Sequence, residues 1–537
     1  MDIKKEIEYI KVNNLLSKDN SYFIQLGSNW KNDYHKIYKV FNNKYNISCT
    51  MDLDIIKPYL QDWSNIPGHA IMLTRPKTEA ECAIILKTCF YCKIPITISA
   101  GQTNLTGSST PKGGIILSTS LLINPEIKID NDSKHITSPA GIPLEDLRNK
   151  ILKLTKNKYY YPVNPTSRYD ALVGGTISCN ASGFIPGEKG ATRYWVDGLT
   201  FLLPNGNQIK ATRGQYVSEN GFFKLKDNNQ IIILPVPTYK RPNIKNASGL
   251  FSSIDGNIDL VDLIIGSEGI LGLVTSCKLR LSKRPNDYLE LFICLESEIK
   301  AIELHDYLIE YYHGDLGQIS ALEYFGYNSQ KYMKHRKFLF KNETDVGVYV
   351  QVPIYNGTVE IKSMEWVSIL SNFDYQIDTN SIIVLNDPLN WKFFFEARHS
   401  IPDNALTKTK SLGGISIITD TIVPPSNYRL YLNKIHNKLK SVNIEYLLFG
   451  HLGDCHLHFH LIPKKNQDDL LLEIYDYMID LSSALGGVYS AEHGTGKRKR
   501  NDFRKCYGNK AVAMIQSLKQ TIDPNFLLNR GNIIQPL

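Results

Sequence analysis

The sequence predicts an α+β fold with two or three packed domains, and three observations lead to this prediction. The chain has 537 residues, too many for one ordinary hydrophobic core. From residue 70, apolar strand-like segments alternate with a helical stretch, as in mixed α/β domains. From about residue 285, strands and helices alternate without glycine-rich loops, which predicts an antiparallel sheet backed by helices and therefore a second domain.

Composition and charge are typical of a compact enzyme. Hydrophobic residues make up 42% and charged residues 21% of the chain, which argues against a disordered chain or a membrane protein. No apolar run reaches the roughly 18 residues of a membrane-spanning helix, and the start, MDIKKEIEYIKVNN, lacks the apolar core of a secretory signal. We therefore expect a cytoplasmic protein, and peripheral attachment to the inner face of a membrane through a basic surface stays open. The net charge of +8 is spread along the chain, so no nucleic-acid partner is expected.

The nine cysteines, an odd number without framework spacing, predict reduced thiols. Cys89 and Cys92 form a CxxC pair inside the apolar helical stretch ECAIILKTCFYC. Since no second CxxC exists to complete a four-thiolate metal site, we expect these two thiols to pack in a core. The basic run from Lys497 to Arg500 is interpreted as the solvated start of a helix rather than as a targeting signal.

The first predicted domain follows a polar stretch, residues 1–65, in which we expect peripheral helices without identified chemistry. AIMLTRP and IPITISA are predicted strands on either side of a helix that ends at Cys92, and GGIILS is the next strand. The connection AGQTNLTGSS, residues 100–109, carries Gly101 and Gly107, which let the backbone turn tightly and bring N–H groups close to an anion. It is a candidate phosphate loop, although an ordinary strand connection is the alternative.

Residues 162–198 form a long segment rich in Gly, Ser, Asn and Thr. Such a segment neither builds a core nor stays structureless inside a compact domain without a reason, and wrapping a large ligand would be that reason. Farther along, the apolar stretch around Gly266, Gly269 and Gly272 predicts a pair of strands at the end of this domain.

The densest group of chemically active side chains lies in residues 447–496, where two short segments hold five of the thirteen histidines. His456, His458 and His460 alternate with apolar residues, so on a strand all three face one way. His451 lies just before them across the turn LGD, and Glu492 comes from a later segment. This set offers nitrogen and oxygen ligands suited to zinc or manganese. Two alternatives stay open, namely a strand face of hydrogen-bonded imidazoles and a metal-dependent hydrolase without a flavin.

A family resemblance extends over residues 70–537. Seven motifs occur in a characteristic order: AGQTNLTG, PVNPTSRYDALVGGTISCNASG, KGATRYWVDGL, IIGSEGILGLVT, FGHLGDCHLH, AEHGTG and DPNFLLNRGNII. In these motifs the chain resembles FAD-linked oxidases of the vanillyl-alcohol oxidase type, and within that group the D-lactate, glycolate and D-2-hydroxyglutarate dehydrogenases. The resemblance implies an α+β fold with a two-lobed PCMH-type FAD-binding domain, an antiparallel-sheet cap domain with helices, and a C-terminal segment that completes the FAD site. The implied parts are an N-terminal extension (1–65), the FAD-binding domain (66–285), the cap or substrate domain (286–480) and the C-terminal segment (481–537).

The same resemblance implies which residues bind a non-covalent FAD. The loop from residue 100 would place its amides on the pyrophosphate, and the later glycine-rich segment would line the diphosphate and the isoalloxazine. Glycines let the backbone approach a flat cofactor, and Ser, Thr and Asn offer uncharged donors. His69 leaves covalent attachment of the flavin open. The implied FAD-binding residues are Ala100, Gly101, Gln102, Thr103, Asn104, Leu105, Thr106, Gly107, Pro165, Thr166, Ser167, Gly174, Gly175, Asn180, Ala181, Ser182, Gly183, Gly190, Arg193 and Gly269.

The resemblance also implies a reaction, the oxidation of a D-2-hydroxy acid to the 2-oxo acid. His493 matches the family's base, which accepts the proton of the C2 hydroxyl while hydride leaves C2 for flavin N5. Arg398 matches the arginine that binds the substrate carboxylate, with a surface ion pair to Glu396 as the alternative. A divalent metal would lower the pKa of the hydroxyl. The implied metal ligands are His451, His458 and Glu492.

Two departures from the family pattern bear on the substrate. His456 and His460 stand where the family commonly has asparagine, so either is open as an extra ligand or a substrate contact. Ile418, two residues before Asp420, stands where relatives with dicarboxylate substrates often have lysine. This favours D-lactate or a similar apolar-tailed acid over D-2-hydroxyglutarate, and glycolate is a further alternative. A non-redox FAD transferase of the alkyl-glycerone-phosphate synthase kind also stays open, whereas the retained base, ligands and arginine argue against an inactive FAD-binding subunit.

The expected partners are a small 2-hydroxy acid and an electron acceptor, either a quinone, a cytochrome or an electron-transfer flavoprotein. The chain has no iron–sulfur cysteine cluster for onward electron transfer. The oligomeric state stays open, and a homodimer is one alternative.

Overall fold

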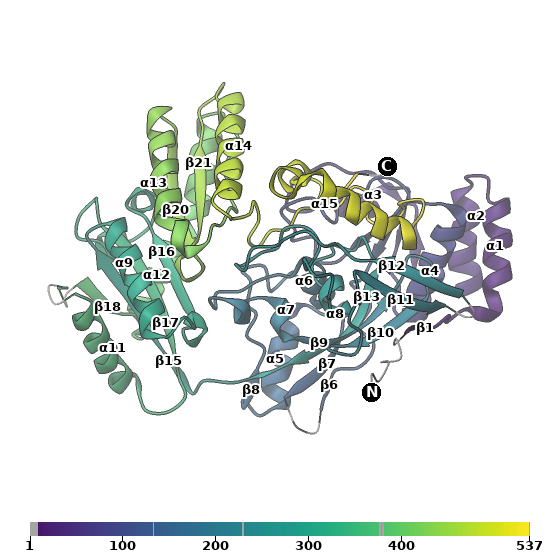
Figure 1. The fold of residues 1–537 in the computed structure, drawn as a ribbon, viewed down its shortest axis with the longest axis horizontal. Coiled ribbons are helices and arrows are strands. Elements are labelled where there is room, and N and C mark those ends of the chain that lie inside the picture. The colour runs from purple at the N-terminus through teal and green to yellow at the C-terminus, as the bar shows by residue number, and fades with distance from the viewer. Residues whose placement is uncertain are drawn as a thin grey trace.

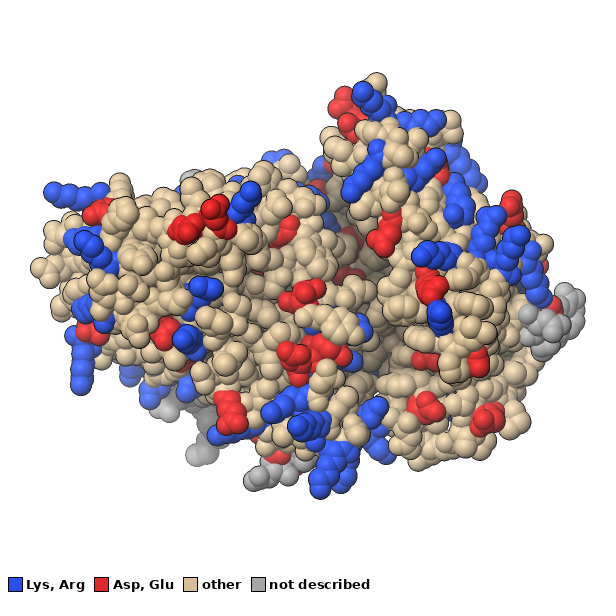
Figure 2. All heavy atoms as spheres, turned by 180° about the vertical axis from the view of Figure 1, so that it is seen from behind, with Lys and Arg blue, Asp and Glu red and all other residues tan. Residues whose placement is uncertain are grey.

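The structure is a computed structural model that describes residues 9–535, apart from 131, 133, 228–229, 375–376 and 379–380. It has two lobes of mixed helices and sheets, which confirms the predicted α+β class (Figure 1). The chain enters the small lobe before β15 (Asp287–Leu295) and leaves it after α14 (Asp468–Ala484). The last long helix, α15 (Arg500–Ile522), lies on the large lobe, so the C-terminal segment returns to the lobe in which the chain begins. Seen from behind, the surface is hollowed between the lobes (Figure 2).

Two main sheets form the frame of the large lobe. The first sheet has a parallel core, as the predicted strand–helix–strand alternation requires, with one antiparallel edge strand. The second sheet is antiparallel throughout. In spatial order the first sheet consists of β2 (Cys49–Thr50), β3 (Met72–Thr74), β5 (Ile115–Ser118) and β4 (Ile96–Ser99). The second consists of β10 (Gln208–Thr212), β9 (Val196–Leu202), β13 (Leu273–Arg280), β7 (His135–Pro139) and β6 (Lys128–Ile129).

The helix α4 (Glu79–Cys92) connects β3 to β4. Its first turn is capped by the Thr78 hydroxyl, which accepts a hydrogen bond from the backbone N–H of Glu81. Cys89 and Cys92 are buried among the apolar side chains that this helix packs beneath the first sheet. This confirms the predicted core packing of the CxxC pair. In the same lobe the helix α5 (Leu144–Leu154) follows β7 along the chain.

The small lobe is built on one antiparallel sheet of seven strands, as the sequence predicts. Helices cover this sheet and contribute to its two apolar cores. In spatial order the strands are β18 (Ile382–Val384), β15, β17 (Val346–Ile354), β16 (Ala321–Phe325), β20 (Glu445–His451), β21 (His456–Ile462) and β19 (Ile417–Ile418). The main helices are α9 (Glu298–Tyr311), α11 (Val359–Phe373), α12 (Pro388–Ser411), α13 (Pro425–Ser441) and α14.

The described part of the N-terminal stretch is an integral layer of the large lobe. The helix α1 (Asn20–Asn29) packs against α4, and the buried ammonium of Lys87 donates hydrogen bonds to Asn14 and Asn20 at 3.1 Å each. The strand β1 (Ile10–Val12) extends a third sheet that also contains β11 (Phe222–Asp227) and β12 (Gln230–Pro235). The second N-terminal helix is α2 (Tyr34–Lys39).

Two sequence predictions are wrong in the structure. The apolar stretch before Gly266 does not form a strand, because Asp259 accepts the N–H of Val261 and caps a short helix, α8 (Leu260–Ile264). The run Lys497 to Arg500 is solvated only in part: Arg498 is exposed, whereas the amino groups of Lys497 and Lys499 are buried and hydrogen bonded. Partners from distant segments compensate for this burial, which charge density along the sequence does not reveal.

No helix in the described part of the chain is long and apolar enough to cross a membrane. The four-part division of the chain stays a proposal. The strand β14 (Ser282–Lys283) pairs with β8 (Tyr159–Tyr160) of the large lobe, whereas β15 belongs to the sheet of the small lobe, and this supports a boundary near residue 285.

Candidate active site

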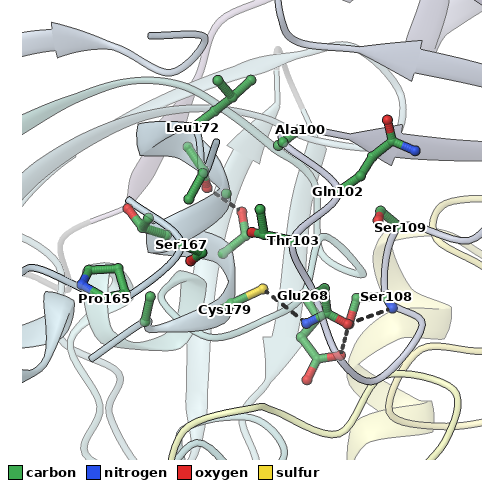
Figure 3. A pocket seen from close by; sticks show the side chains of 18 of the residues that line it. Ala100, Gln102, Thr103, Ser108, Ser109, Pro165, Ser167, Leu172, Cys179 and Glu268 are labelled. Carbon is green, nitrogen blue, oxygen red and sulfur yellow. Dashed lines mark hydrogen bonds between the residues drawn. The ribbon is translucent and has the colours of Figure 1, made fainter. Parts of the chain in front are cut away.

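A deep cleft opens where the two lobes meet, with an empty volume of about 1380 Å³ that includes space open to solvent. Its walls come from the loop after β4, from the segment before and within α6 (Val173–Cys179), and from the histidine segments near the C-terminus. Most of the predicted FAD-binding residues line it, and Figure 3 shows several of them. Those that line the cleft are Ala100, Gly101, Gln102, Thr103, Asn104, Leu105, Pro165, Thr166, Ser167, Gly174, Gly175, Ala181, Ser182, Gly183 and Gly269.

Glycines let the loop of residues 100–107 and the segment of residues 162–198, the two cofactor segments, pack closely. A Cβ added at Gly101 would lie 2.0 Å from the carbonyl oxygen of Asp170, and one added at Gly183 would lie 2.3 Å from Oδ1 of Asn164. Both distances are far inside van der Waals contact, so any larger residue would push the segments apart. The hydroxyl and amide groups of these segments provide an uncharged donor set that fits a dinucleotide such as FAD.

Five of the predicted FAD-binding residues lie behind the wall of the cleft. The Thr106 hydroxyl donates to Asn104 Oδ1 at 2.9 Å, and its carbonyl oxygen accepts the N–H of Lys497 at 2.8 Å. Arg193 is buried in an ion pair with Asp262 at 2.9 Å. Because these groups already have protein partners, they hold the loops in shape. The five residues are Thr106, Gly107, Asn180, Gly190 and Arg193.

The N-terminal stretch also reaches the cleft, which the sequence did not reveal. Trp63 lines it with 51% of its surface exposed, and its backbone N–H donates to the carbonyl oxygen of Gln102 at 3.1 Å. Asp62 accepts hydrogen bonds from the N–H and the hydroxyl of Ser109, each at 3.2 Å. The indole is therefore fixed at the edge of the candidate phosphate loop. A tryptophan in an otherwise polar stretch was the only sequence signal.

The turn between β20 and β21 builds the histidine cluster. β20 ends at His451, and the antiparallel register places His456 directly opposite it. His458 follows on the same face of β21, and Glu492 arrives from the connection between α14 and α15. One ligand atom from each of these four residues lies within 4.8 Å of the others. The structure therefore gathers the three predicted metal ligands and adds His456 to them.

Each of the three histidines has one ring nitrogen next to an oxygen atom outside the cluster, which leaves the other nitrogen for an ion; on His451 that other nitrogen contacts Glu492. Carboxylate and carbonyl oxygens in such positions are typical behind metal-bound imidazoles, because they fix the tautomer and the ring orientation. The donor set therefore fits a divalent metal. The contacts are His451 Nδ1 to Glu323 Oε1 (2.6 Å), His458 Nδ1 to the Thr419 carbonyl oxygen (2.9 Å) and His456 Nε2 to Asp420 Oδ1 (3.1 Å).

Glu492 is held in place by a buried lysine. Lys245 forms ion pairs with Glu492 and, at 3.0 Å, with Asp454. Glu492 Oε1 also lies 3.2 Å from Nε2 of His451. Burial would lower the pKa of Lys245, but the two carboxylates outweigh it and raise that pKa. The ammonium is thus a permanent positive charge beside the cluster, and nothing in its local sequence marked it.

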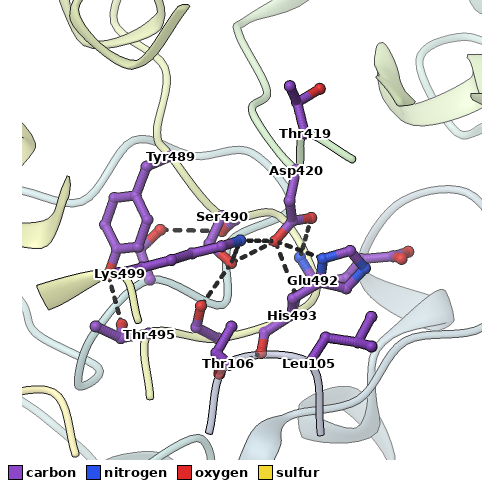
Figure 4. A network of polar contacts seen from close by, with 12 residues as sticks. Leu105, Thr106, Thr419, Asp420, Tyr489, Ser490, Glu492, His493, Thr495 and Lys499 are labelled. Atoms are coloured by element: carbon purple, nitrogen blue, oxygen red, sulfur yellow. Dashed lines mark hydrogen bonds and ion pairs between the residues drawn. The ribbon is translucent and has the colours of Figure 1, made fainter. Parts of the chain in front are cut away.

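Asp420 is the centre of a second buried network (Figure 4). Its carboxylate accepts the N–H of His493 at 3.0 Å and the N–H of Glu492 at 3.2 Å. It also accepts the Ser490 hydroxyl and the Lys499 ammonium, the latter at 2.8 Å. Burial would raise the pKa of Asp420, but His493 and Lys499 hold it well below its usual range. This carboxylate therefore stays charged and ties the segment just after β19 to the segment that carries His493.

His493 lies between the cofactor loop and the histidine cluster. It lines the cleft, its Nδ1 is 3.4 Å from Asp420 Oδ2, and its ring is parallel to that of His458 with centroids 5.8 Å apart. Its carbonyl oxygen accepts hydrogen bonds from Asn104 at 3.4 Å and Thr106 at 3.3 Å. Burial lowers the pKa of His493 to about 4, against the opposing charge of Asp420. The neutral imidazole is able to accept a proton.

Arg398 projects from α12 toward the cleft. Its Nη2 lies 3.2 Å from Glu323 Oε2, and its guanidinium lies 4.8 Å from the ring centroid of Phe184, which lines the cleft. The sequence alternative, a pair with Glu396, is wrong because Glu396 pairs with His335 instead. Glu323 thus links Arg398 to His451 of the histidine cluster.

His460 lies outside the cluster and hydrogen bonds with Ser416. Burial lowers the pKa of His460 to about 4. Ile418 lies directly opposite His460 on the neighbouring strand, so both side chains point to the face of the sheet that carries the cluster. The face of the sheet that carries the cluster therefore continues with the apolar side chain of Ile418 and the neutral imidazole of His460.

Two of the residues that sequence reasoning missed are charges inside or just after strands. Glu323 is the one acid of the strand ALEYF, and Asp420 follows Ile417, Ile418 and Thr419. A charge in such a context is a signal, since it is buried only if paired. Lys245 and Lys499 carried no comparable signal.

Comparisons with known proteins match the fold and the cleft. The family model for an FAD binding domain matches residues 70–212, and the model for the C-terminal domain of FAD linked oxidases matches residues 370–533. The chain is 26% identical over 485 residues to the mitochondrial D-2-hydroxyglutarate dehydrogenase of Danio rerio, covering 89% of this chain and 81% of the relative. It is 24% identical over 498 residues to a D-lactate dehydrogenase of Anaerostipes hadrus, covering 90% and 94%. It shares its fold with a solved alkyldihydroxyacetonephosphate synthase, at a TM-score of 0.58 and 13% identity, covering 90% of this chain and 81% of that one.

Proposed function

Because the chain belongs to the FAD-linked oxidases, we propose that it is an FAD-dependent dehydrogenase that oxidises a D-2-hydroxy acid to the 2-oxo acid. The observation that carries this proposal is the placement of His493. This residue lines the same cleft as the cofactor segments and is bonded through its backbone to the candidate phosphate loop. Relatives that are D-2-hydroxyglutarate and D-lactate dehydrogenases support the same reaction class.

The chain's own groups supply binding, orientation and proton transfer. A non-covalently bound FAD would supply the acceptor, at flavin N5, for the hydride of substrate C2. His493 accepts the proton of the C2 hydroxyl on Nε2, because its Nδ1 faces Asp420. The carboxylate of Asp420 then stabilises the imidazolium that forms. Proton transfer of this kind is typically worth about 100-fold to 10,000-fold in rate.

A divalent metal, zinc or manganese, would be held by His451, His458 and Glu492. The ion would act as a Lewis acid that lowers the pKa of the substrate hydroxyl. The prearranged contacts behind the imidazoles support this part of the proposal, as do donor atoms that lie within reach of one ion.

Arg398 would bind the substrate carboxylate. One of its nitrogens pairs with Glu323, which leaves the rest of the guanidinium for a charge-assisted hydrogen bond with a ligand. Ile418 and His460 offer no positive charge for a second carboxylate, which favours D-lactate or a similar apolar-tailed acid. Electrons would pass on to a quinone, a cytochrome or an electron-transfer flavoprotein.

The test is an anaerobic panel of D- and L-2-hydroxy acids, including lactate, glycolate and 2-hydroxyglutarate, followed at the flavin absorbance. We expect rapid bleaching by D-lactate and little by the L-acids. His493→Ala should stay yellow and lose this bleaching by at least about 100-fold. A yellow protein that none of these acids reduces would refute the dehydrogenase. It would favour the non-redox transferase, for which the shared fold with alkyldihydroxyacetonephosphate synthase is the supporting observation.

A further inference from the structure

We infer that His456 is a fourth protein ligand of the metal, so that the site is a three-histidine, one-glutamate set built for a nitrogen-preferring ion such as Zn²⁺. This inference rests on the metal that the proposed function places at His451, His458 and Glu492. The residue itself is one of the two at which the chain departs from the family pattern, and the structure separates the two: His456 joins the cluster and His460 does not.

The backbone directs His456 into the cluster. It lies directly opposite His451 in the β20–β21 register and two residues before His458 on the same strand face. Its ring centroid is 4.6 Å from that of His458 and 5.7 Å from that of His451. A change of rotamer would have to carry the ring through buried neighbours, since its side chain is fully buried.

The ring nitrogen of His456 that faces the cluster is Nδ1. Asp420 Oδ1 lies 3.1 Å from Nε2 of His456, which turns Nδ1 toward Glu492 Oε1 at 4.0 Å. Among the described residues neither ring nitrogen has a hydrogen-bond partner, and only Nε2 has a close ion-pair contact, the one with Asp420. A buried polar atom left in this state costs stability. Coordination to an ion would remove that cost.

The distances suit a shared ion. Zinc binds imidazole nitrogen and carboxylate oxygen at roughly 2.0–2.2 Å, so two of its ligand atoms lie at most about 4.4 Å apart. Glu492 Oε1 lies 3.2 Å from His451 Nε2 and 4.0 Å from His456 Nδ1, within this limit. Three imidazoles favour zinc over manganese, because manganese prefers oxygen ligands.

The experiment compares wild type, His456→Asn and the matched control His460→Asn, each as the full chain loaded with FAD. Zn²⁺ affinity is measured by competition with a chromophoric chelator, and the number of nitrogen ligands by the superhyperfine splitting of bound Cu²⁺ in electron paramagnetic resonance. We expect three coupled nitrogens in wild type and in His460→Asn, and two in His456→Asn. Zn²⁺ affinity should fall by at least about 10-fold in His456→Asn alone, and the ratio of Zn²⁺ to Mn²⁺ affinity should fall with it.

The outcomes separate this inference from the proposed function. Wild-type protein with two coupled nitrogens overturns the inference and leaves the three-ligand site standing, and this spectrum needs no variant to fold. Equal Zn²⁺ affinity of wild type and His456→Asn also overturns it. Wild-type protein that binds neither Zn²⁺ nor Cu²⁺ at this cluster overturns both the inference and the metal in the proposed function. Flavin reduction by D-lactate is recorded on the same samples, so the dehydrogenase is judged separately.

Discussion

Asp420 offers the sharpest test of how the site is organised, because one carboxylate orients two histidines. Its oxygens lie 3.1 Å from Nε2 of His456 and 3.4 Å from Nδ1 of His493. Asp420→Asn preserves the shape of the side chain but removes the charge that would stabilise a protonated His493. We expect the anaerobic rate of flavin reduction by D-lactate to fall by about 100-fold to 10,000-fold, the range associated with loss of a positioned base.

The same substitution should also cost stability, and the structure gives the magnitude. Lys499 is 5% exposed and its ammonium lies 2.8 Å from Asp420. Removing one partner of a buried ion pair leaves an uncompensated charge and typically costs about 3–5 kcal/mol. The free energy of unfolding of Asp420→Asn, measured by urea unfolding, should therefore drop by about this amount.

A double variant separates the two effects. Asp420→Asn combined with Lys499→Met removes both charges, so most of the lost stability should return, since apolar replacement of a buried pair is often neutral. The rate of flavin reduction should stay low, because the carboxylate beside His493 is still missing. A folded, yellow Asp420→Asn protein that reduces its flavin at the wild-type rate would refute the orienting role. Recovery of the rate in the double variant would show that instability alone had slowed the single variant.

Three further predictions address other parts of the site. Trp63→Ala should weaken FAD binding by roughly 2-fold to 10-fold if the indole packs on a cofactor ring, measured by flavin fluorescence titration; equal affinity would remove Trp63 from the cofactor site. Arg398→Lys should lower kcat/KM for D-lactate by roughly 10-fold to 150-fold, because lysine cannot serve Glu323 and the substrate carboxylate together, and an unchanged value would exclude the carboxylate contact. Burial lowers the pKa of Lys497 to about 7, so between pH 7 and pH 9 the unfolded chain keeps a proton that the folded chain has released. The free energy of unfolding of wild type, measured by urea unfolding, should then rise by about 2 kcal/mol relative to Lys497→Met over this range. If the difference between the two proteins does not change with pH, the pKa of Lys497 is not lowered.

Much of the fold follows from local patterns in the sequence. The strand–helix–strand alternation gives the parallel core of the first sheet, and the alternation of His456, His458 and His460 with apolar residues gives the shared face of β21. Both patterns have short periods that the backbone imposes on neighbouring residues. The glycine-rich segments could also be located from the sequence, because a backbone approach as close as that at Gly101 leaves no room for a larger residue.

The charges that organise the site could not be predicted in this way. Lys245 pairs with Glu492 from a segment more than two hundred residues away, and Lys499 pairs with Asp420 across the boundary between the lobes. An ion pair between distant segments has no sequence period, because tertiary folding alone decides which charges meet. The basic run before α15 was misread for this reason. Its composition resembles a solvated helix start, whereas the partners of its two buried lysines lie just after β19 and in the cofactor loop.

The charge balance of this network bears on both the metal and the substrate. Contacts link four carboxylates, Glu323, Asp420, Asp454 and Glu492, with the three cations Arg398, Lys245 and Lys499. With a divalent ion bound and its imidazole ligands neutral, this network would carry one excess positive charge. A single substrate carboxylate would then neutralise the site, whereas a second carboxylate would require a further cation. Ile418, on the face shared with the cluster, supplies none. The electrostatics therefore favour a monocarboxylic 2-hydroxy acid, and Ile418→Lys is the substitution expected to raise the relative kcat/KM for D-2-hydroxyglutarate over D-lactate.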